Sequence, residues 1–556
     1  MRNKRVLLLF VFLFTILLLF FVIDNNTIPQ LTFSKESGFY DDSFYLDINS
    51  NVDGIIYYTI DGSDPTTNSS VYEEPIYIYD ASINDNVYSA RDDVSSGFFT
   101  DFIKEYSRND PEYEVPNYLV DKCFVVKAFV RTNKGIESDV ETKVYFVNFA
   151  DKEGYQNMNI ISVVTDPDNL FDYYDGIYTT GINFAESMEK VVSDNNNEER
   201  IYWEHMNANY SRNNASEKET NCQVFVSNQL VLDQNCIIKI HGGGSRSFNQ
   251  KSLNLYARDE NNDDGIFNYN FFGNNYYPSS VTLFCGGDDN DIKLKDYIVN
   301  VLYKDNNFST SNYEPFVLFL DGEYWGFYWL TEKYDENYIE HYYKIRENNT
   351  IIIKNNVIEV GNENDISFYN DFYNFCVSND MNNQDNYQKL ISMIDVDSFV
   401  DYYSSLVYVG RCGDWPGGNV ALWRSRKTSE SKFEDGKWRW MLFDVNSYAI
   451  DYDYIDYDNY SDLLEDPLFS SIIKNEKIKE KFFVKLKELE TTIFSAENVN
   501  ELLTTIGKQI YEASNMSNKR FWGEKSSNVY PNGLKMIEYF FENRPEYIDK
   551  IINEYK

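Results

Sequence analysis

The sequence predicts an α+β protein in which a strand-rich N-terminal part precedes a mixed part that ends in helices. Apolar residues alternate with period two from residue 31 to 148, and strand and helix patterns mix from residue 159 onward. Beyond Leu463, apolar residues recur at helical spacing with Lys–Glu pairs between them. With 556 residues, 43% of them hydrophobic, the chain can bury large cores, and we expect two to four domains.

The charge balance excludes some classes of function. The chain has 50 basic and 89 acidic side chains, which gives a formal net charge of −39. Nucleic-acid binding needs a basic surface, so we expect no nucleic-acid partner. With only three histidines, a multi-histidine zinc site and a Ser-His-Asp triad are both disfavoured.

Residues 1–28 predict a signal anchor or a signal peptide. Basic residues precede an apolar run from Val6 to Ile23, which is just long enough to cross a bilayer of roughly 30 Å as a helix. No small-residue cleavage site follows, which favours an uncleaved membrane anchor over a cleaved signal. The positive-inside rule places the bulk of the chain outside the cytoplasm, tethered or secreted.

The six cysteines include no C-x-x-C pair, which argues against zinc ribbons and thioredoxin-like chemistry. Two interpretations stay open for Cys222 and Cys236. They either close a disulfide across a polar loop or are packed thiols, like the cysteines that lie in apolar runs.

Residues 30–150 predict a small antiparallel β-sandwich. Short strands such as Phe44–Ile48 and Gly54–Ile60 are separated by turn residues, of which Asp61–Pro65 is the strongest example. The run Ile56–Thr66 resembles the hallmark of the chitobiase/β-hexosaminidase C-terminal type of domain. That resemblance implies the fold, with polysaccharide binding or a plain spacer as alternative roles.

Residues 157–556 form the second predicted part, with a polar insertion at about 194–219 and a helical tail at about 463–556. Asp321-Gly322 lies between two aromatic-rich runs, and this dipeptide favours a type I′ hairpin turn.

A loop and a predicted hairpin carry the residues with the clearest chemistry. Asp414 and Asn419 are five apart, and two predicted strands, Val420–Trp423 and Trp438–Phe443, then lead to Asp444. In kinase-type phosphoryl transfer an Asp accepts the hydroxyl proton, an Asn in the pattern D-x-x-x-x-N binds magnesium, and a later Asp holds the metal at the phosphates. The hairpin should bring Asn419 and Asp444 to the same end of adjacent strands.

Upstream, a glycine loop separates two predicted strands, Cys236–Ile240 and Ser252–Tyr256. Gly243 lies in the loop, and Arg246 and Lys251 follow it. Glycines let backbone amides approach a phosphate, and a lysine supplies a point charge. The alternative interpretation is a hairpin turn with solvated cations.

With these residues in place, the region from about 160 to 448 resembles the CotH kinase family, the spore-coat-associated atypical protein kinases. The matching runs are Ile161–Phe171, Ile240–Lys251, Leu320–Glu336, Asp414–Asn419 and Trp440–Asp444. The resemblance implies an ATP- and magnesium-dependent protein kinase with a reduced kinase-like fold.

The resemblance also implies roles for individual residues. Asp414 would be the catalytic base or orienting carboxylate, and Asn419 and Asp444 would be the metal ligands. Lys251 would contact the phosphates, in a nucleotide site that includes Gly243 and Arg246.

Glu332 would position the nucleotide or form an ion pair with Lys251, and Asp296 is the rival partner for that lysine. The family often has a second basic residue where this chain has Gln250, and a second acid where it has Asn446. An amide brings no charge to magnesium, so a slow or inactive enzyme is an alternative.

Two acidic segments have competing interpretations. Residues 286–291 lack the ligand spacing of an EF-hand and are interpreted as a polar turn rather than a calcium site. Residues 451–458 follow Asp444, where kinases keep their activation segment. One interpretation is that they gate the substrate or recruit a basic peptide, and the other is that they form a solvated loop.

We therefore predict a protein kinase that phosphorylates hydroxyl side chains of a coat or cell-surface protein. The substrate is expected to be basic and Ser/Thr-rich, given the net charge of −39. The alternative from another class is a noncatalytic wall or spore-coat assembly protein that binds polysaccharide through the sandwich.

Overall fold

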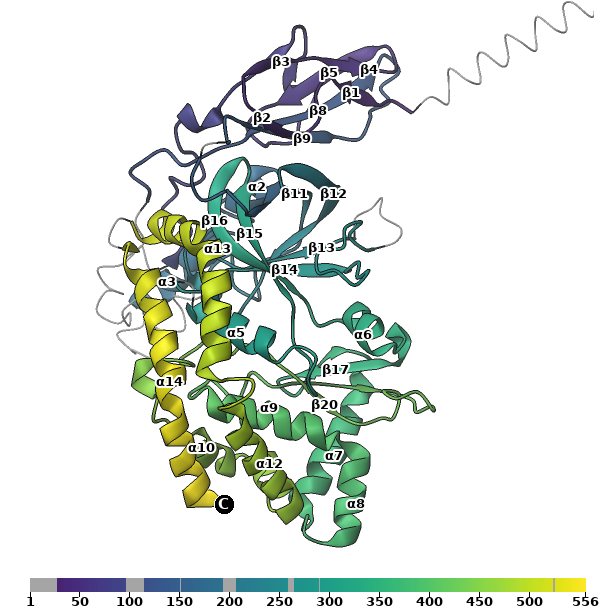
Figure 1. Ribbon diagram of the computed structural model, residues 1–556. Coiled ribbons are helices and arrows are strands. Elements are labelled where there is room, and N and C mark those ends of the chain that lie inside the picture. The colour runs from purple at the N-terminus through teal and green to yellow at the C-terminus, as the bar shows by residue number, and fades with distance from the viewer. Residues whose placement is uncertain are drawn as a thin grey trace, which may run out of the picture.

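The structure is a computed structural model, and it describes residues 28–96, 115–150, 152–193, 207–258, 265–289, 291–523 and 526–556. An N-terminal β-sandwich, a closed β-barrel and a C-terminal unit of helices around a four-stranded sheet follow one another along the molecule (Figure 1). The predicted α+β class is confirmed. The predicted leader lies outside the described residues, within which no helix has both the length and the apolarity to cross a membrane.

The N-terminal unit is a sandwich of short strands. They are β1 (Leu31–Phe33), β2 (Gly38–Tyr40), β3 (Phe44–Leu46), β4 (Ile48–Ser50), β5 (Gly54–Thr59), β6 (Ser70–Val71), β7 (Ile76–Ile78), β8 (Phe124–Thr132) and β9 (Glu141–Val147). A sheet in the order β2-β9-β8-β5-β6 shares its core with the pairs β1–β4 and β3–β7. The predicted antiparallel pattern has one exception: β2 and β9 pair in parallel, because they are distant in the chain and no hairpin joins them.

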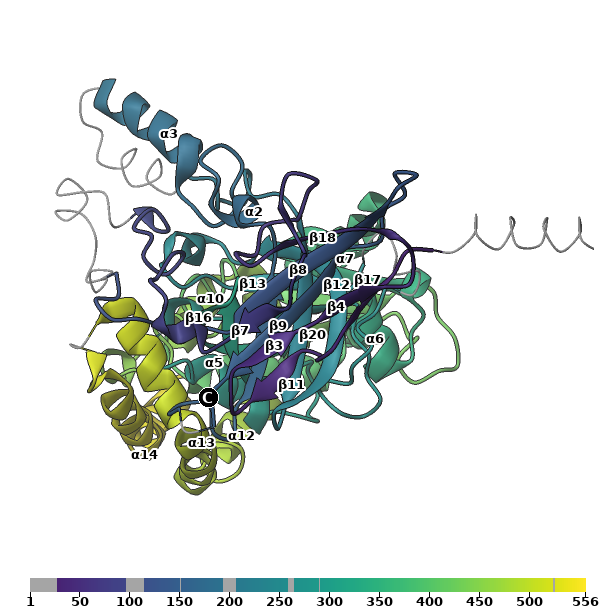
Figure 2. The same cartoon turned by 90° about the horizontal axis from the view of Figure 1, so that it is seen from above.

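The barrel is closed, in the order β10-β11-β12-β13-β14-β16-β15. Its strands are β10 (Asn159–Val164), β11 (Lys218–Val226), β12 (Gln229–Ile240), β13 (Leu253–Tyr256), β14 (Ser280–Phe284), β15 (Tyr313–Leu320) and β16 (Glu323–Glu332), with helices α2 (Pro167–Phe171), α3 (Gly181–Ser193) and α5 (Lys295–Leu302). The pairing of β15 with β16 confirms the hairpin predicted at Asp321-Gly322, and β12 and β13, the strands predicted on either side of the glycine loop, also pair with each other. Helix α3 projects from the body of the barrel (Figure 2).

Part of the predicted polar insertion, residues 194–206, lies outside the described residues. All six cysteines are buried thiols, as the packed-thiol interpretation expects. In the ladder between β11 and β12, Cys222 lies opposite Gln234 and Cys236 lies opposite Thr220, so the two cysteines are out of register for a disulfide.

The sandwich is fixed to the barrel. The ring of Phe146 in β9 lies 5.3 Å from that of Phe225 and 5.0 Å from that of Phe319, both in barrel strands. The Glu323 carboxylate accepts hydrogen bonds from the backbone N–H groups of Val87 (2.7 Å) and Ser89 (2.6 Å). These contacts make the two units one packed body.

The C-terminal unit surrounds a sheet in the order β18-β17-β19-β20. Its elements are β17 (Thr350–Lys354), β18 (Val357–Val360), β19 (Ala421–Ser425), β20 (Arg439–Met441), α6 (Glu336–Tyr343), α7 (Ile366–Ser378), α8 (Gln384–Met393), α9 (Val396–Tyr408), α10 (Asn459–Glu465), α11 (Pro467–Ile472), α12 (Glu476–Leu489), α13 (Ala496–Trp522) and α14 (Val529–Tyr555). The buried helix α9 packs against β20 and α12, and α13 returns to pack against β16 of the barrel (Figure 1). The last two helices therefore hold the barrel and the C-terminal unit together.

Candidate functional site

One edge of the four-stranded sheet brings the two predicted metal ligands together. Lys354 of β17 lies opposite Ala421 of β19, which in turn lies opposite Met441 of β20. Asn419 comes two residues before Ala421, and Asp444 comes three residues after Met441. Both therefore lie at the same edge, as the antiparallel hairpin predicts.

The backbone at both positions is left-handed. Asn419 has φ 56° and Asp444 has φ 59°, a region that Asn and Asp adopt more readily than other non-glycine residues. The Asn355 N–H donates to the carbonyl of Val420 (2.8 Å), and the Val420 N–H donates to Oδ1 of Asn355 (3.1 Å). The turn after β17 thus holds the chain next to Asn419, and backbone held in this way is common at functional sites.

Asp414 lies in a loop that is tied to the segment after Asp444. The Gly413 N–H donates to the carbonyl of Ser447 (2.9 Å), and the Gly418 N–H donates to the carbonyl of Asp414 (2.7 Å). The neighbouring Trp415 is buried, whereas the Asp414 carboxylate is exposed. The loop is therefore anchored on both sides while its carboxylate stays accessible.

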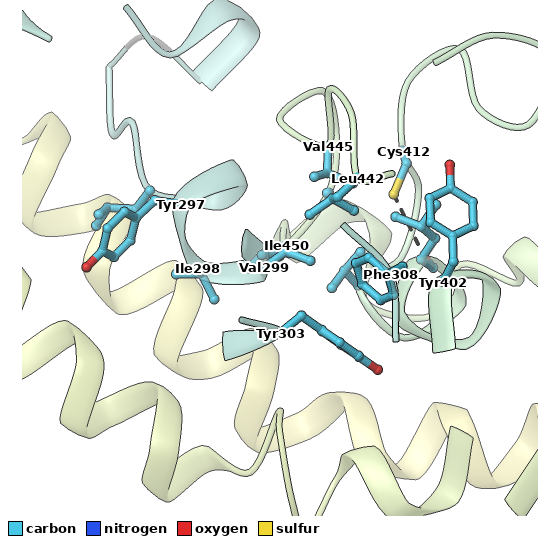
Figure 3. Close-up of a cluster of buried hydrophobic side chains, with 14 of the residues drawn as sticks. Tyr297, Ile298, Val299, Tyr303, Phe308, Tyr402, Cys412, Leu442, Val445 and Ile450 are labelled. Carbon is cyan, nitrogen blue, oxygen red and sulfur yellow. Dashed lines mark hydrogen bonds between the residues drawn. The ribbon is translucent and has the colours of Figure 1, made fainter. Parts of the chain in front are cut away.

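A cluster of buried hydrophobic side chains packs under the Asp414 loop and under the segment that contains Asp444 (Figure 3). Leu442 and Val445 flank Asp444, and they belong to the same buried core as Cys412 and as Ile298 and Val299 of α5. Close packing of this kind leaves little freedom to the loops above it.

The surroundings of Asp444 are acidic. Its Oδ1 accepts a hydrogen bond from Nδ2 of Asn446 (3.0 Å), and Oδ1 of Asp296 accepts one from the Val445 N–H (3.0 Å). Burial, followed by the negative charges of Asp296 and Asp288, raises the pKa of Asp444 to about 6, and the charge of Lys354 opposes that rise. The site therefore carries negative charge that the protein leaves without full compensation.

The polar turn predicted at 286–291 adjoins this acidic site, with Asn290 outside the described residues. Gly287 has φ 57°, and a Cβ there would lie 2.8 Å from Nδ2 of Asn446, so a larger residue would have to displace that side chain. Oδ2 of Asp289 caps the start of α5 by accepting from the N–H groups of Leu294 (2.7 Å) and Lys295 (2.9 Å). The exposed Asp288 is the contribution of this turn to the site, and the sequence pattern, interpreted as a polar turn, gave it no ligand role.

The donor set fits magnesium better than a closed metal cage. Within the described part of the chain, no three His, Cys, Asp or Glu side chains converge as a metal-binding group. Magnesium is usually held by one or two carboxylates together with water and substrate phosphates. Asp444, with Asn446 hydrogen-bonded to it and Asn419 at the same sheet edge, provides such a partial set.

Lys251 does not have the position that the sequence predicts. Its side chain is fully buried, and its ammonium donates to the backbone carbonyls of Val94 (2.7 Å), Arg246 (2.7 Å) and Phe248 (2.6 Å). An ammonium has three hydrogens, so these three acceptors use all of them. Lys251 therefore has no donor left for a phosphate, and its role in this structure is to hold the glycine loop.

Arg246 is held in a similar way, whereas Gly243 is open. Nε of Arg246 donates to the carbonyl of Gly242 (2.7 Å), and Nη1 donates to that of Tyr210 (3.2 Å). A Cβ built on Gly243 would meet no atom within 4 Å. Of the predicted phosphate-binding residues, Gly243 is the one that leaves room for a ligand.

Glu332 does not pair with Lys251, and neither does Asp296. The buried Glu332 carboxylate accepts from the Asn312 N–H (2.8 Å) and from the hydroxyl of Tyr342 (2.5 Å). Asp296 accepts from Val445 and Tyr313 instead. The predicted ion pair is wrong because backbone carbonyls, rather than a carboxylate, satisfy the lysine.

Of the basic residues that face this region, Arg246 was predicted from the sequence, whereas Lys354, Lys333 and Arg212 were not. Lys354 ends β17, and its ammonium lies 3.5 Å from the ring centroid of Phe443, the neighbour of Asp444. Burial, together with the charges of Lys354, Arg246, Lys333 and Arg212, lowers the pKa of His241 to about 3. These cations come from four segments, so no local motif identifies them as a group.

The acidic segment at 451–458 lies beside the Asp414 loop. The guanidinium of Arg411 stacks 4.6 Å from the ring of Tyr448 and 5.2 Å from that of Tyr454. Asp451 forms a salt bridge with Lys295 (3.6 Å). The segment is therefore packed against the site, although two of its aspartates, Asp453 and Asp456, are exposed.

Two family models match the chain. The model described as CotH kinase protein matches residues 238–548, and the model described as Fn3 associated matches residues 46–145. No match was found among curated proteins. The first match contains the glycine loop, Asp414, Asn419 and Asp444, and the second covers most of the sandwich.

Proposed function

Because the chain belongs to the CotH kinase protein family, we propose that it is an atypical protein kinase that transfers the γ-phosphoryl group of ATP to a hydroxyl side chain. One observation carries the proposal: the sheet register places Asn419 and Asp444 at one edge, with the Asp414 loop fastened to the segment that follows Asp444. A proton acceptor and metal ligands in this order are the parts that phosphoryl transfer requires.

Each residue has a distinct task in this proposal. Asp444 and Asn419 would hold magnesium, with Asn446 orienting Asp444 through its hydrogen bond. When bound, the ion would neutralise charge on the phosphates. Asp414 accepts the proton of the substrate hydroxyl as the bond from that oxygen to the γ-phosphorus forms and the bond to the ADP oxygen breaks. Gly243 lets the backbone of the glycine loop approach the nucleotide.

The chain differs from the family pattern at Gln250 and at Asn446, and only the second difference lies in the proposed metal site. Gln250 is buried and donates to the carbonyl of Phe327 (2.9 Å), so this position serves the packing of the barrel. Asn446 lies in the acidic site, where an amide supplies less attraction for magnesium than a carboxylate. We therefore expect a working enzyme with weak magnesium affinity.

The proposal is tested by Asp414→Asn. Loss of a general base usually lowers the rate by roughly 10²- to 10⁴-fold, and the exposed side chain should leave the fold intact. Transfer of labelled phosphate from ATP to a basic serine-rich peptide is the measurement, with the exposed sandwich residue Asp42→Asn as control. Equal incorporation by the Asp414→Asn variant would refute the assigned role.

The proposed substrate is a basic, Ser/Thr-rich coat or cell-surface protein. The net charge of −39 and the exposed aspartates of the 451–458 segment would attract such a chain. We further propose that residues 6–23 tether the protein to a membrane with its bulk outside the cytoplasm, or direct its secretion. The wall or spore coat is then the compartment in which it acts.

A second function, polysaccharide binding, is favoured by a row of tyrosines on the sandwich. Tyr45 is 66% exposed and Tyr77 is 50% exposed, and they lie opposite each other in β3 and β7 with ring centroids 5.1 Å apart. Tyr79 continues the row, 5.8 Å from Tyr77. Exposed aromatic rings in a row usually mark an interaction surface.

The polysaccharide function is tested by Tyr77→Ser in the full chain. Retention on insoluble cell-wall polysaccharide should fall for this variant and stay unchanged for Tyr174→Ser, which alters an exposed tyrosine elsewhere. Equal retention of both variants would refute the assignment of the tyrosine row as a glycan-binding site.

A further inference from the structure

The ammonium of Lys354 is charged, half-buried and without a salt bridge in the described part of the chain. It lies over the ring of Phe443 at 3.5 Å, one residue before Asp444. The chain has 89 acidic against 50 basic side chains, so acidic partners are plentiful. A cation without a salt bridge in such a chain requires an explanation.

Lys354 has other cations around it. Burial is the largest of the effects that lower the pKa of Lys354 to about 8. The negative charges of Glu359 and Asp444 oppose that change, and the positive charges of Arg212 and Lys333 add to it to a smaller extent. Lys333 follows β16 directly, and its ammonium lies 5.0 Å from the ring of Tyr256. Like Lys354, neither Arg212 nor Lys333 is in a salt bridge among the residues described. Like charges that gather in this way are stabilised by a bound anion.

The position of this basic group relative to the acidic one identifies the kind of anion. His241, the first residue of the glycine loop, feels the charge of Lys354 more strongly than that of any other cation, which places Lys354 close to the loop. Lys354 also lies at the sheet edge that carries Asn419 and Asp444. Lys354 thus lies at the edge of the proposed metal ligands and within electrostatic reach of His241 in the glycine loop, in the region where a phosphate chain bound to magnesium would lie.

We propose that Lys354, supported by Lys333 and Arg212, is the phosphate-binding cation of the nucleotide site, in the place that the sequence pattern assigns to Lys251. The inference rests on the proposed kinase function. A lysine binds phosphate as a point charge, and its stem here is held by an aromatic ring. Lys251 supports the glycine loop through backbone carbonyls and does not touch the ligand.

Calorimetry on the full chain tests this assignment with two probes, ATP with magnesium and inorganic tripolyphosphate alone. Lys354→Met should weaken the binding of both probes by at least roughly tenfold, which corresponds to about 1.4 kcal/mol. Lys354→Arg keeps the charge and should retain most of the affinity. Lys389→Met is the matched control, because Lys389 also lies over a phenylalanine ring, at 4.2 Å in α8.

The outcomes separate this inference from the proposed function. If the wild type binds neither probe, the kinase function itself fails. If the wild type binds ATP and Lys354→Met binds both probes equally well, the assignment of Lys354 is overturned and the kinase function stands. If Lys354→Met and Lys333→Met both lose tripolyphosphate while their thermal unfolding matches that of Lys389→Met, the assignment is supported.

Discussion

Two lysines in two regions of this molecule show how differently a buried positive charge can be used. Lys251, at the start of β13 in the barrel, gives all its ammonium hydrogens to backbone carbonyls. Lys354, at the end of β17 in the C-terminal sheet, rests on a phenylalanine ring and has no carboxylate within salt-bridge distance among the described residues. The lysine of the barrel is fully hydrogen-bonded within the protein, whereas the lysine at the sheet edge keeps its charge available for a ligand.

This difference between the two lysines indicates that the barrel stabilises the fold and that the sheet edge binds a ligand. A polar group that is fully hydrogen-bonded in the free protein contributes to stability and gains nothing from a ligand. A group with unused hydrogen-bonding or charge capacity lowers stability until a ligand completes it. Asp444 at the same sheet edge has this second property, because burial, followed by the charges of its acidic neighbours, raises its pKa.

Asp444→Asn should have the largest effect of the variants considered, because it should greatly lower activity while it increases stability. Metal ions contribute several kcal/mol to transition-state stabilisation, so phosphate transfer should fall by on the order of 10³-fold or more. The metal-free protein should nevertheless become more stable above pH 6, by about 1–2 kcal/mol after allowance for solvent screening. Labelled-phosphate assays and urea unfolding measure the two effects.

The sign of that stability change follows from the raised pKa. Folded Asp444 has a pKa of about 6 against the ordinary value of 3.8, so the folded state holds the proton more tightly. Wild-type stability therefore falls relative to the variant as pH rises from about 4 to about 6. A variant that loses activity and is also less stable at pH 8 would contradict the view that this edge serves function at the expense of stability.

Lys251→Met should also have a large effect, and it acts on stability at every pH. Three buried carbonyls lose their donor, and at roughly 1 kcal/mol each the free energy of unfolding should fall by about 3 kcal/mol. Lys354→Met should change it by less than about 1 kcal/mol, because no salt bridge is lost. Urea unfolding of the two variants side by side is the measurement. If Lys251→Met unfolds like the wild type and fails only to bind ATP, the roles of the two lysines are reversed.

These two lysines also show what could be predicted from the sequence. Asn419 and Asp444 were found because they stand beside a hairpin, so local pairing alone fixes their common edge. The hairpin at Asp321-Gly322 was predictable for the same reason. Lys354 is a single lysine at a strand end, and its position depends on the pairing of β17 with β19, which lies over sixty residues further along the chain. The burial of Lys251 depends equally on Val94, far upstream.

Asp321→Asn probes the barrel, where the hairpin turn contains a buried carboxyl. Burial raises the pKa of Asp321 to about 8, although the Thr165 N–H donates to its Oδ1 (2.8 Å). The folded state holds the extra proton, so the free energy of unfolding of the wild type should fall relative to the variant by up to about 1.4 kcal/mol per pH unit between pH 4 and 8. The backbone at Asp321 has φ 45°, which asparagine adopts easily.

The control for this measurement is Asp305→Asn. Asp305 has a similar left-handed backbone, with φ 66°, but its side chain is exposed. The difference between Asp305→Asn and the wild type should stay constant with pH over the same window. A flat difference for Asp321→Asn as well would show that the buried carboxyl is ionised in the folded protein, and that the barrel does not satisfy its charges as described.

Asn446→Asp should give the smallest effect and bears directly on the open charge of the sheet edge. The substitution replaces the donor to Oδ1 of Asp444 with a carboxylate, so the metal-free protein should lose about 1 kcal/mol through like-charge repulsion. The same carboxylate should raise the affinity for magnesium several-fold, because hard cations prefer charged oxygen ligands. Magnesium should therefore raise the melting temperature of this variant more than that of the wild type.

Asn374→Asp, which adds a charge on the exposed face of α7, should show neither change. If magnesium stabilises all three proteins equally, Asn446 does not face the ion, and the metal ligands must be sought beyond Asp444.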